Sequence, residues 1–150
     1  MRYTILISIF LFATFISCKK EKFSTTPSLK FENVNTQNLH PGEVIKFTLS
    51  FTYKGDLTGN IFVQEIVPKC ASMEMDTINQ PYKLPAFPAS QNQKGEITVS
   101  YGYNVTGYSP ISTPKCPLRN DTATFRFVLQ ADSAHLSDTV SSPPVVIYYQ

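Results

Sequence analysis

Residues 45–54 read Ile45-Lys46-Phe47-Thr48-Leu49-Ser50-Phe51-Thr52-Tyr53-Lys54, and apolar and polar side chains alternate through the whole stretch. Successive side chains of a β-strand point to opposite faces. This period of two therefore predicts a strand with one buried face and one solvated face. The polar positions hold lysine, serine and threonine, which suit a wet surface. A sheet that is covered on one face only is thus the expected foundation of the fold.

The same alternation recurs in shorter form along the chain. Further strands are predicted near residues 29–34, 61–67, 97–103, 125–129 and 145–149, with a short edge strand over 82–87. Turn-forming residues such as His40-Pro41-Gly42 separate them, and no stretch shows the apolar stripe of a helix. The chain is therefore predicted to be all-β: an immunoglobulin-like β-sandwich of about seven strands over residues 28–150.

The N-terminal residues predict export. Arg2 is followed by an apolar run from Ile5 to Ile16, which is too short to span a bilayer because a spanning helix needs about twenty residues. Phe15-Ile16-Ser17-Cys18 resembles a bacterial lipobox, whose cysteine is acylated and becomes the new N-terminus. We expect a signal peptide over 1–17, lipidation of Cys18 and a tether over 18–27. The lipid would hold the protein to a membrane of the bacterial cell envelope.

The composition bounds the possible partners. The formal net charge is +2, and only 16% of the residues are charged. No basic cluster of the kind that binds nucleic acid follows the N-terminal lysines, so DNA and RNA are not expected partners. Eleven prolines, eleven phenylalanines and eight tyrosines favour a β-rich exported domain.

Cys70 and Cys116 remain once Cys18 is assigned to the lipid. An exported protein meets an oxidising environment, so a Cys70–Cys116 disulfide is expected, with two reduced thiols as the alternative. The disulfide would close a loop of about 45 residues and stabilise the fold by roughly 3–4 kcal/mol. His40 and His135 have no metal-ligand spacing with the cysteines, so neither a metal site nor a cofactor is predicted.

Four segments carry a resemblance to a known group of proteins: Phe51-Thr52-Tyr53-Lys54-Gly55-Asp56-Leu57, Tyr82-Lys83-Leu84-Pro85, Lys94-Gly95-Glu96-Ile97 and Ser137 through Ile147. The mature chain resembles small lipoproteins of Bacteroidetes, mostly of unknown function. Their turn often reads Asp-Gly-Asp-Leu-Gly, like a calcium loop, but Lys54 replaces one aspartate here. A tight turn around Asp56 is therefore expected rather than a calcium site. Lys20-Glu21 resembles the family's signal for the outer face of the outer membrane, which makes the outer membrane the expected location.

Four of the five aspartates are followed by serine or threonine and then by a small or aliphatic residue: Asp76-Thr77-Ile78, Asp121-Thr122-Ala123, Asp132-Ser133-Ala134 and Asp138-Thr139-Val140. The triplet resembles the acceptor motif for protein O-glycosylation in Bacteroidetes. That resemblance implies Thr77, Thr122, Ser133 and Thr139 as modification sites. The alternative is that these pairs form turns and strand starts, as they do in many sandwiches.

The search for chemistry finds no catalytic residues. Nucleophile-elbow, phosphate-loop and paired-histidine motifs are absent from the sequence. Tyr101 and Tyr103 share the phase of the core residues, which leaves Tyr108 and Tyr148 as the exposed tyrosines that could bind a partner. We expect a non-catalytic binding or structural module that contacts another envelope protein or a glycan. The alternatives are a ligand-capturing lipoprotein of a nutrient uptake system and a small envelope enzyme.

Overall fold

The computed structural model describes residues 23–68, 75–88, 90–111 and 118–149. The predicted signal peptide over 1–17, the lipidation site Cys18 and the predicted disulfide partners Cys70 and Cys116 lie outside these residues. The described part of the chain contains ten strands and no helix, and hence no helix that could cross a membrane.

The strands follow the predicted alternation closely. In chain order they are β1 (Ser28–Val34), β2 (Asn38–Leu39), β3 (Val44–Tyr53), β4 (Asn60–Pro68), β5 (Met75–Lys83), β6 (Gln93–Gly102), β7 (Ser109–Pro110), β8 (Asp121–Gln130), β9 (Val140–Ser141) and β10 (Val145–Ile147). The two-residue strands β2, β7 and β9 were not predicted, because two residues are too few to show a period.

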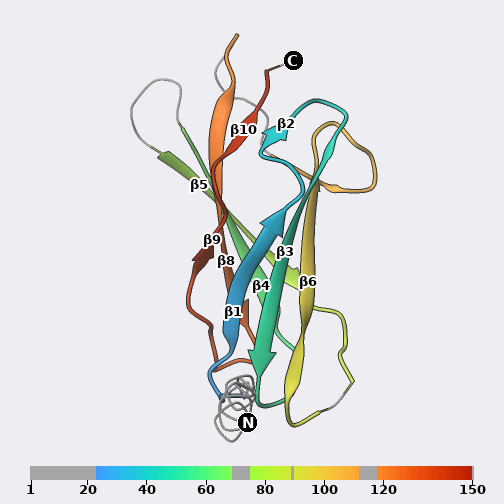
Figure 1. The fold of residues 1–150 in the computed structure, drawn as a ribbon, viewed down its shortest axis with the longest axis vertical. Helices are drawn as coiled ribbons and strands as arrows, with labels where there is room; N and C mark the ends of the chain where they lie inside the picture. Colours follow the sequence, from blue (N-terminus) through green and yellow to red (C-terminus); the bar gives the residue numbers. More distant parts are fainter. Residues whose placement is uncertain (1–22, 69–74, 89, 112–117, 150) are drawn as a thin grey trace, which may run out of the picture.

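The strands form two sheets (Figure 1). The four-stranded sheet has the order β1-β3-β6-β7, and the six-stranded sheet has the order β2-β10-β8-β4-β5, with β9 paired to β8. The first part of the chain contributes to both: β1 is antiparallel to β3, and β2 is parallel to β10 in the other sheet. This is the arrangement of an immunoglobulin-like β-sandwich, so the predicted fold class is confirmed.

Aromatic rings from the two sheets meet in the core. The ring of Phe47 on β3 lies 4.6 Å from that of Phe125 and 5.3 Å from that of Phe127, both on β8. The alternating positions of β3 from Ile45 to Tyr53 are all buried, as the sequence predicted. Tyr101 is buried with them and packs on Phe125 at 5.9 Å.

The long strands run the length of the sandwich, so the turns gather at two poles (Figure 1). We call the end where β1 begins the N-terminal pole; it comprises residues 23–27, 54–59, 84–88, 90–92 and 131–135. Backbone hydrogen bonds join these segments, from Thr58 N to Ala131 O at 3.0 Å and from Leu84 N to Gly59 O at 3.2 Å. The opposite end, where β10 finishes, is the C-terminal pole; it comprises residues 40–43, 103–108, 148 and 149.

Part of the predicted tether is packed against the domain. The backbone N–H of Lys54 donates a hydrogen bond of 2.8 Å to the carbonyl of Ser24, and Pro27 is buried. The segment 24–27 is therefore fixed to the turn after β3, and any free tether must lie before it.

The edge strand lies earlier than the sequence indicated. A strand was expected over 82–87, whereas β5 covers Met75–Lys83 and residues 84–88 are irregular. Pro85 and Pro88 cannot donate to a ladder, which ends the strand. Pro81 lies inside β5, opposite Phe62, and is tolerated because β5 is at the edge of its sheet.

Phe47→Ala tests the central contact between the sheets. Removing a ring that is fully buried should lower the free energy of unfolding by about 3–5 kcal/mol. Lys46→Ala, one residue away on the solvated face, should change it by less than about 0.5 kcal/mol. Urea unfolding followed by circular dichroism measures both, and equal effects of the two variants would contradict the assigned core.

Candidate functional site

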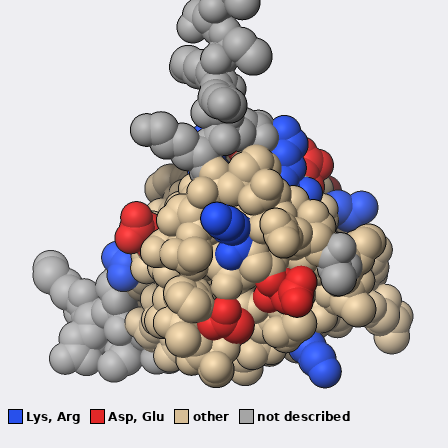
Figure 2. Space-filling model, turned by 90° about the horizontal axis from the view of Figure 1, so that it is seen from below, with Lys and Arg blue, Asp and Glu red and all other residues tan. Residues whose placement is uncertain are grey.

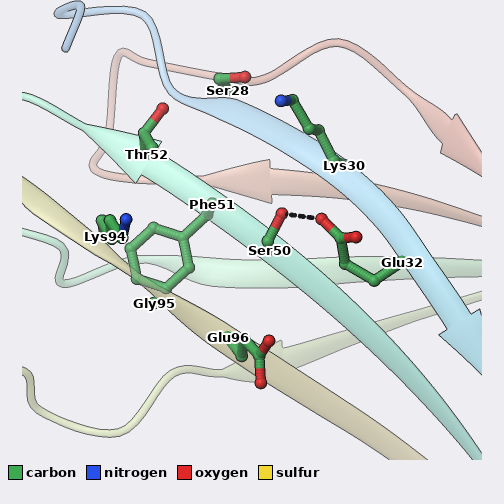
Figure 3. Close-up of a pocket in the computed structure, with 9 residues that line it drawn as sticks. All are labelled: Ser28, Lys30, Glu32, Ser50, Phe51, Thr52, Lys94, Gly95 and Glu96. Atoms are coloured by element: carbon green, nitrogen blue, oxygen red, sulfur yellow. Dashed lines mark hydrogen bonds between the residues drawn. The ribbon is translucent and has the colours of Figure 1, made fainter. Parts of the chain in front are cut away.

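A groove of about 450 Å³ lies on the outer face of the four-stranded sheet. Three neighbouring strands, β1, β3 and β6, supply its residues, and Figure 3 shows them in close-up. The lining residues are Ser28, Lys30, Glu32, Ser50, Phe51, Thr52, Lys94, Gly95 and Glu96. Seven of them have polar side chains, and the exposed lining is a mixture of polar and apolar surface.

The register of the strands places these residues in rows. Ser28 pairs with Thr52, and Thr52 pairs with Lys94, which forms the row nearest the N-terminal pole. Two residues further along, Lys30 pairs with Ser50, which pairs in turn with Glu96. A hydroxyl on the central strand is thus flanked by charged side chains on the strands beside it.

A carboxylate on β1 also faces the groove. Glu32 shares the alternation phase of Ser28 and Lys30, and the register of β1 against β3 shifts beside it, between Phe31 and Asn33. The Ser50 hydroxyl donates a hydrogen bond to the Glu32 carboxylate (Figure 3). The groove therefore presents two ammonium groups, of Lys30 and Lys94, and two carboxylates.

Sequence analysis did not identify the groove. Its signal was present: the polar phase of residues 46–54 was assigned to solvent, and Ser50 and Thr52 belong to that phase. The missing information was which strands lie beside each other. Residues 28–32 and 94–96 are far apart in the sequence, and only the strand order brings both against β3.

A second cluster lies at the N-terminal pole, around Asp132. The Tyr53 hydroxyl donates a hydrogen bond of 2.7 Å to Asp132 Oδ2, and the backbone N–H groups of Ala134 and His135 donate to Oδ1 at 2.8 and 3.0 Å. His135 Nδ1 lies 2.8 Å from Oδ2. The carboxylate thus ties the end of β3 to the turn after β8.

These hydrogen bonds change the acidity of both partners. The pKa of Asp132 is held well below its usual value, chiefly by the Tyr53 hydroxyl and then by the Ala134 N–H and the His135 ring. The bond to Asp132, together with burial, raises the pKa of Tyr53 to about 12. The ionised carboxylate and the neutral phenol are therefore the stable pair at neutral pH.

The two predicted binding tyrosines lie in loop segments of the C-terminal pole, Tyr108 just before β7 and Tyr148 just after β10. Tyr108 is 43% exposed, and its Cβ lies over Gly102 at the outer side of β6. Tyr148 follows buried Ile147 on β10 and stacks on the ring of His40, with centroids 4.1 Å apart. Tyr148 is half-buried rather than exposed, and neither tyrosine lines the groove.

The other predicted sites are dispersed. The hydroxyl-bearing residues Thr77, Thr122, Ser133 and Thr139 are all exposed. No group of three or more His, Cys, Asp or Glu side chains within the described ranges could hold a metal ion.

Comparisons with known proteins support the fold and go no further. No protein-family model matches the chain, and no curated protein matches it. Among solved structures, the sporulation control protein Spo0M of Bacillus subtilis superposes with a TM-score of 0.53 at 9% identity, over 83% of this chain and 50% of that one. A β-glucosidase of Listeria innocua matches with a TM-score of 0.38 at 12% identity, over 87% of this chain and 17% of that one. The chain spans half or less of the length of these structures, and at 9% identity the likeness to Spo0M concerns the fold alone.

Asp132→Asn should destabilise the protein in a pH-dependent way. The Asp132 carboxylate is stabilised by its donors only when ionised, so its contribution is fully present above the unfolded pKa of about 3.9 and is lost as pH falls through the lower folded pKa. At neutral pH the variant should lose about 1–3 kcal/mol of unfolding free energy, and the gap to the unmodified protein should narrow below about pH 4.

Urea unfolding at a series of pH values measures this difference. Asp138→Asn, at an exposed acid outside the cluster, provides the control and should show no comparable gap. A loss for Asp132→Asn that is the same at pH 7 and at about pH 3 would mean that the ionised carboxylate is not what stabilises the turn.

Proposed function

We propose that this protein is a non-catalytic binding module, anchored through Cys18 in the bacterial cell envelope, which holds a polar segment of another envelope protein in its groove. The groove on β1, β3 and β6 is the observation that carries the proposal. Its volume falls in the range of ligand sites, which is roughly 300–1,000 Å³.

The chemistry of the groove favours a charged polypeptide. Lys30 and Lys94 can pair with carboxylates of a partner, and Glu32 and Glu96 can pair with its basic groups. Complementary charges of both signs fix the register of an extended segment and exclude wrong partners. An apolar ligand would have to strip water from these groups without replacing their hydrogen bonds.

A protein partner fits better than a glycan. Sugar rings are commonly held by stacking on an exposed aromatic face, and the one aromatic residue in the lining, Phe51, is only 3% exposed. The described part holds one cluster that joins a carboxylate to a histidine ring. Its carboxylate, Asp132, accepts hydrogen bonds from Tyr53, Ala134 and His135 and so stabilises a turn, which agrees with a non-catalytic role.

Membrane anchorage rests on the lipobox and agrees with the geometry. The described chain begins at the N-terminal pole, so a lipid on Cys18 would leave the side face with the groove accessible. We further propose the outer membrane as the location and O-linked glycans on Thr77, Thr122, Ser133 and Thr139, all of which are exposed. The predicted Cys70–Cys116 disulfide remains part of the proposal.

Photo-crosslinking in the native envelope tests the groove. A photoreactive residue at Thr52 should give a protein adduct, and the double variant Lys30→Glu/Lys94→Glu should reduce that adduct about tenfold or more, because each reversal replaces attraction by repulsion. Quantitative blotting of the adduct measures the change.

A matched charge reversal provides the control. Lys83→Glu/Arg126→Glu alters the net charge equally but lies on β5 and β8 of the other sheet, so the Thr52 adduct should persist. An undiminished adduct in the Lys30→Glu/Lys94→Glu protein, or an adduct removed by glycosidase and not by protease, would refute a polypeptide ligand in the groove.

Cys18→Ala tests the anchor. Cleavage and acylation at a lipobox both require the cysteine, so the variant should accumulate as an uncut precursor without lipid. Intact-mass spectrometry of the purified protein distinguishes the two forms. A Cys18→Ala protein that is cut and remains in the membrane fraction at the normal level would rule out anchorage through this residue.

A further inference from the structure

The distance between Cys18 and the folded domain is short. Ser24 is fixed by its hydrogen bond to Lys54 at the N-terminal pole, and it lies six positions after Cys18, with five residues between them. Six extended residues reach at most about 20 Å. Strand β3 alone has ten residues and spans about 33 Å from one pole to the other. A lipid on Cys18 can therefore bring the N-terminal pole to a bilayer surface but cannot bring the C-terminal pole there.

The N-terminal pole carries few charges. Residues 84–88 and 90–92, which form its broadest loop, include no acidic or basic side chain. Figure 2 views this end of the molecule and shows basic and acidic side chains interspersed with uncharged surface. The acids in the pole segments are Asp56 and Asp132, and Asp132 is engaged by Tyr53 and His135.

The sequence before the pole adds positive charge. Lys19, Lys20 and Lys22 outnumber Glu21 between Cys18 and the domain, and Lys54 lies exposed at the pole itself. Basic residues are attracted to an anionic lipid surface, which favours contact over separation. The pole segments themselves hold one lysine, Lys54, and two acids, Asp56 and Asp132, so this attraction comes from the lysines that precede the domain.

We propose that the N-terminal pole rests on the surface of a phospholipid bilayer, so that the strands stand away from the membrane and the C-terminal pole points outward. This inference rests on the proposed lipidation of Cys18 and goes beyond it, because a lipid with a long tether would leave the orientation free. The loop 84–88 and residues 90–92 are the contact surface, and lipid headgroups are the partner.

Tryptophan fluorescence tests the orientation cleanly, because the chain contains no tryptophan. Ala86→Trp places a reporter at an exposed position of the N-terminal pole, and Thr106→Trp places the matched control at an exposed position of the C-terminal pole. The lipidated proteins are bound to vesicles of phosphatidylethanolamine and phosphatidylglycerol that contain a lipid with a nitroxide on its headgroup. Ala86→Trp should lose most of its emission, and Thr106→Trp should keep its own.

A longer tether isolates the cause. Inserting about twenty Gly and Ser residues between Lys22 and Phe23 adds a flexible reach of roughly 25 Å and should restore much of the Ala86→Trp emission. Gln91→Trp, also exposed at the N-terminal pole, repeats the measurement if Ala86→Trp does not fold.

The outcomes separate this inference from the anchor. Lipidated protein that sediments with the vesicles but shows equal quenching at the two poles, or none at either, overturns the orientation and leaves the anchor intact. Protein whose mass shows no lipid on Cys18 overturns the anchor, and the placement of the pole with it.

Discussion

The packing of Phe47 against Phe125 and Phe127 is the contact on which the rest of the structure depends. These rings come from different sheets and lie 4.6 and 5.3 Å apart, which sets the spacing of the two layers. Once this side of β3 faces the core, strict alternation turns Ser50 and Thr52 outward. The position of the groove residues of β3 on the outer face therefore follows from the burial of the alternate residues in the core.

The strand order adds what alternation alone does not determine. Strand β3 lies between β1 and β6, so Ser50 on its outer face has a charged residue on each side, Lys30 and Glu96, and Thr52 has Lys94 on one side. Glu32, in the groove-facing phase of β1, accepts a hydrogen bond from Ser50. A binding surface arises here from three strands that are distant in sequence, and its charges are balanced between the two signs.

The difference between alternation within a strand and the order of strands in a sheet explains how much could be predicted from the sequence. Local periodicity was sufficient for β3, β6 and β8, because ten residues of alternation admit one reading. Periodicity could not predict β2, β7 and β9, because each has two residues and is defined only by its pairing with a neighbouring strand. The bounds of β5 were missed because Met75–Lys83 shows no regular alternation of apolar and polar residues. Pro81 is acceptable within it because β5 lies at a sheet edge.

In the candidate site too, features with a local sequence signal could be predicted and contacts between distant residues could not. Exposure of Tyr108 could be inferred from its loop, but the stacking of Tyr148 on His40 joins residues more than a hundred positions apart and left no local signal. Ser28, Thr52 and Lys94 form the groove's row nearest the N-terminal pole. If that pole rests on a bilayer, the groove opens sideways close to the lipid headgroups. A partner held in the same membrane would then meet the groove at a high effective concentration, so even modest charge pairing would be sufficient to retain it.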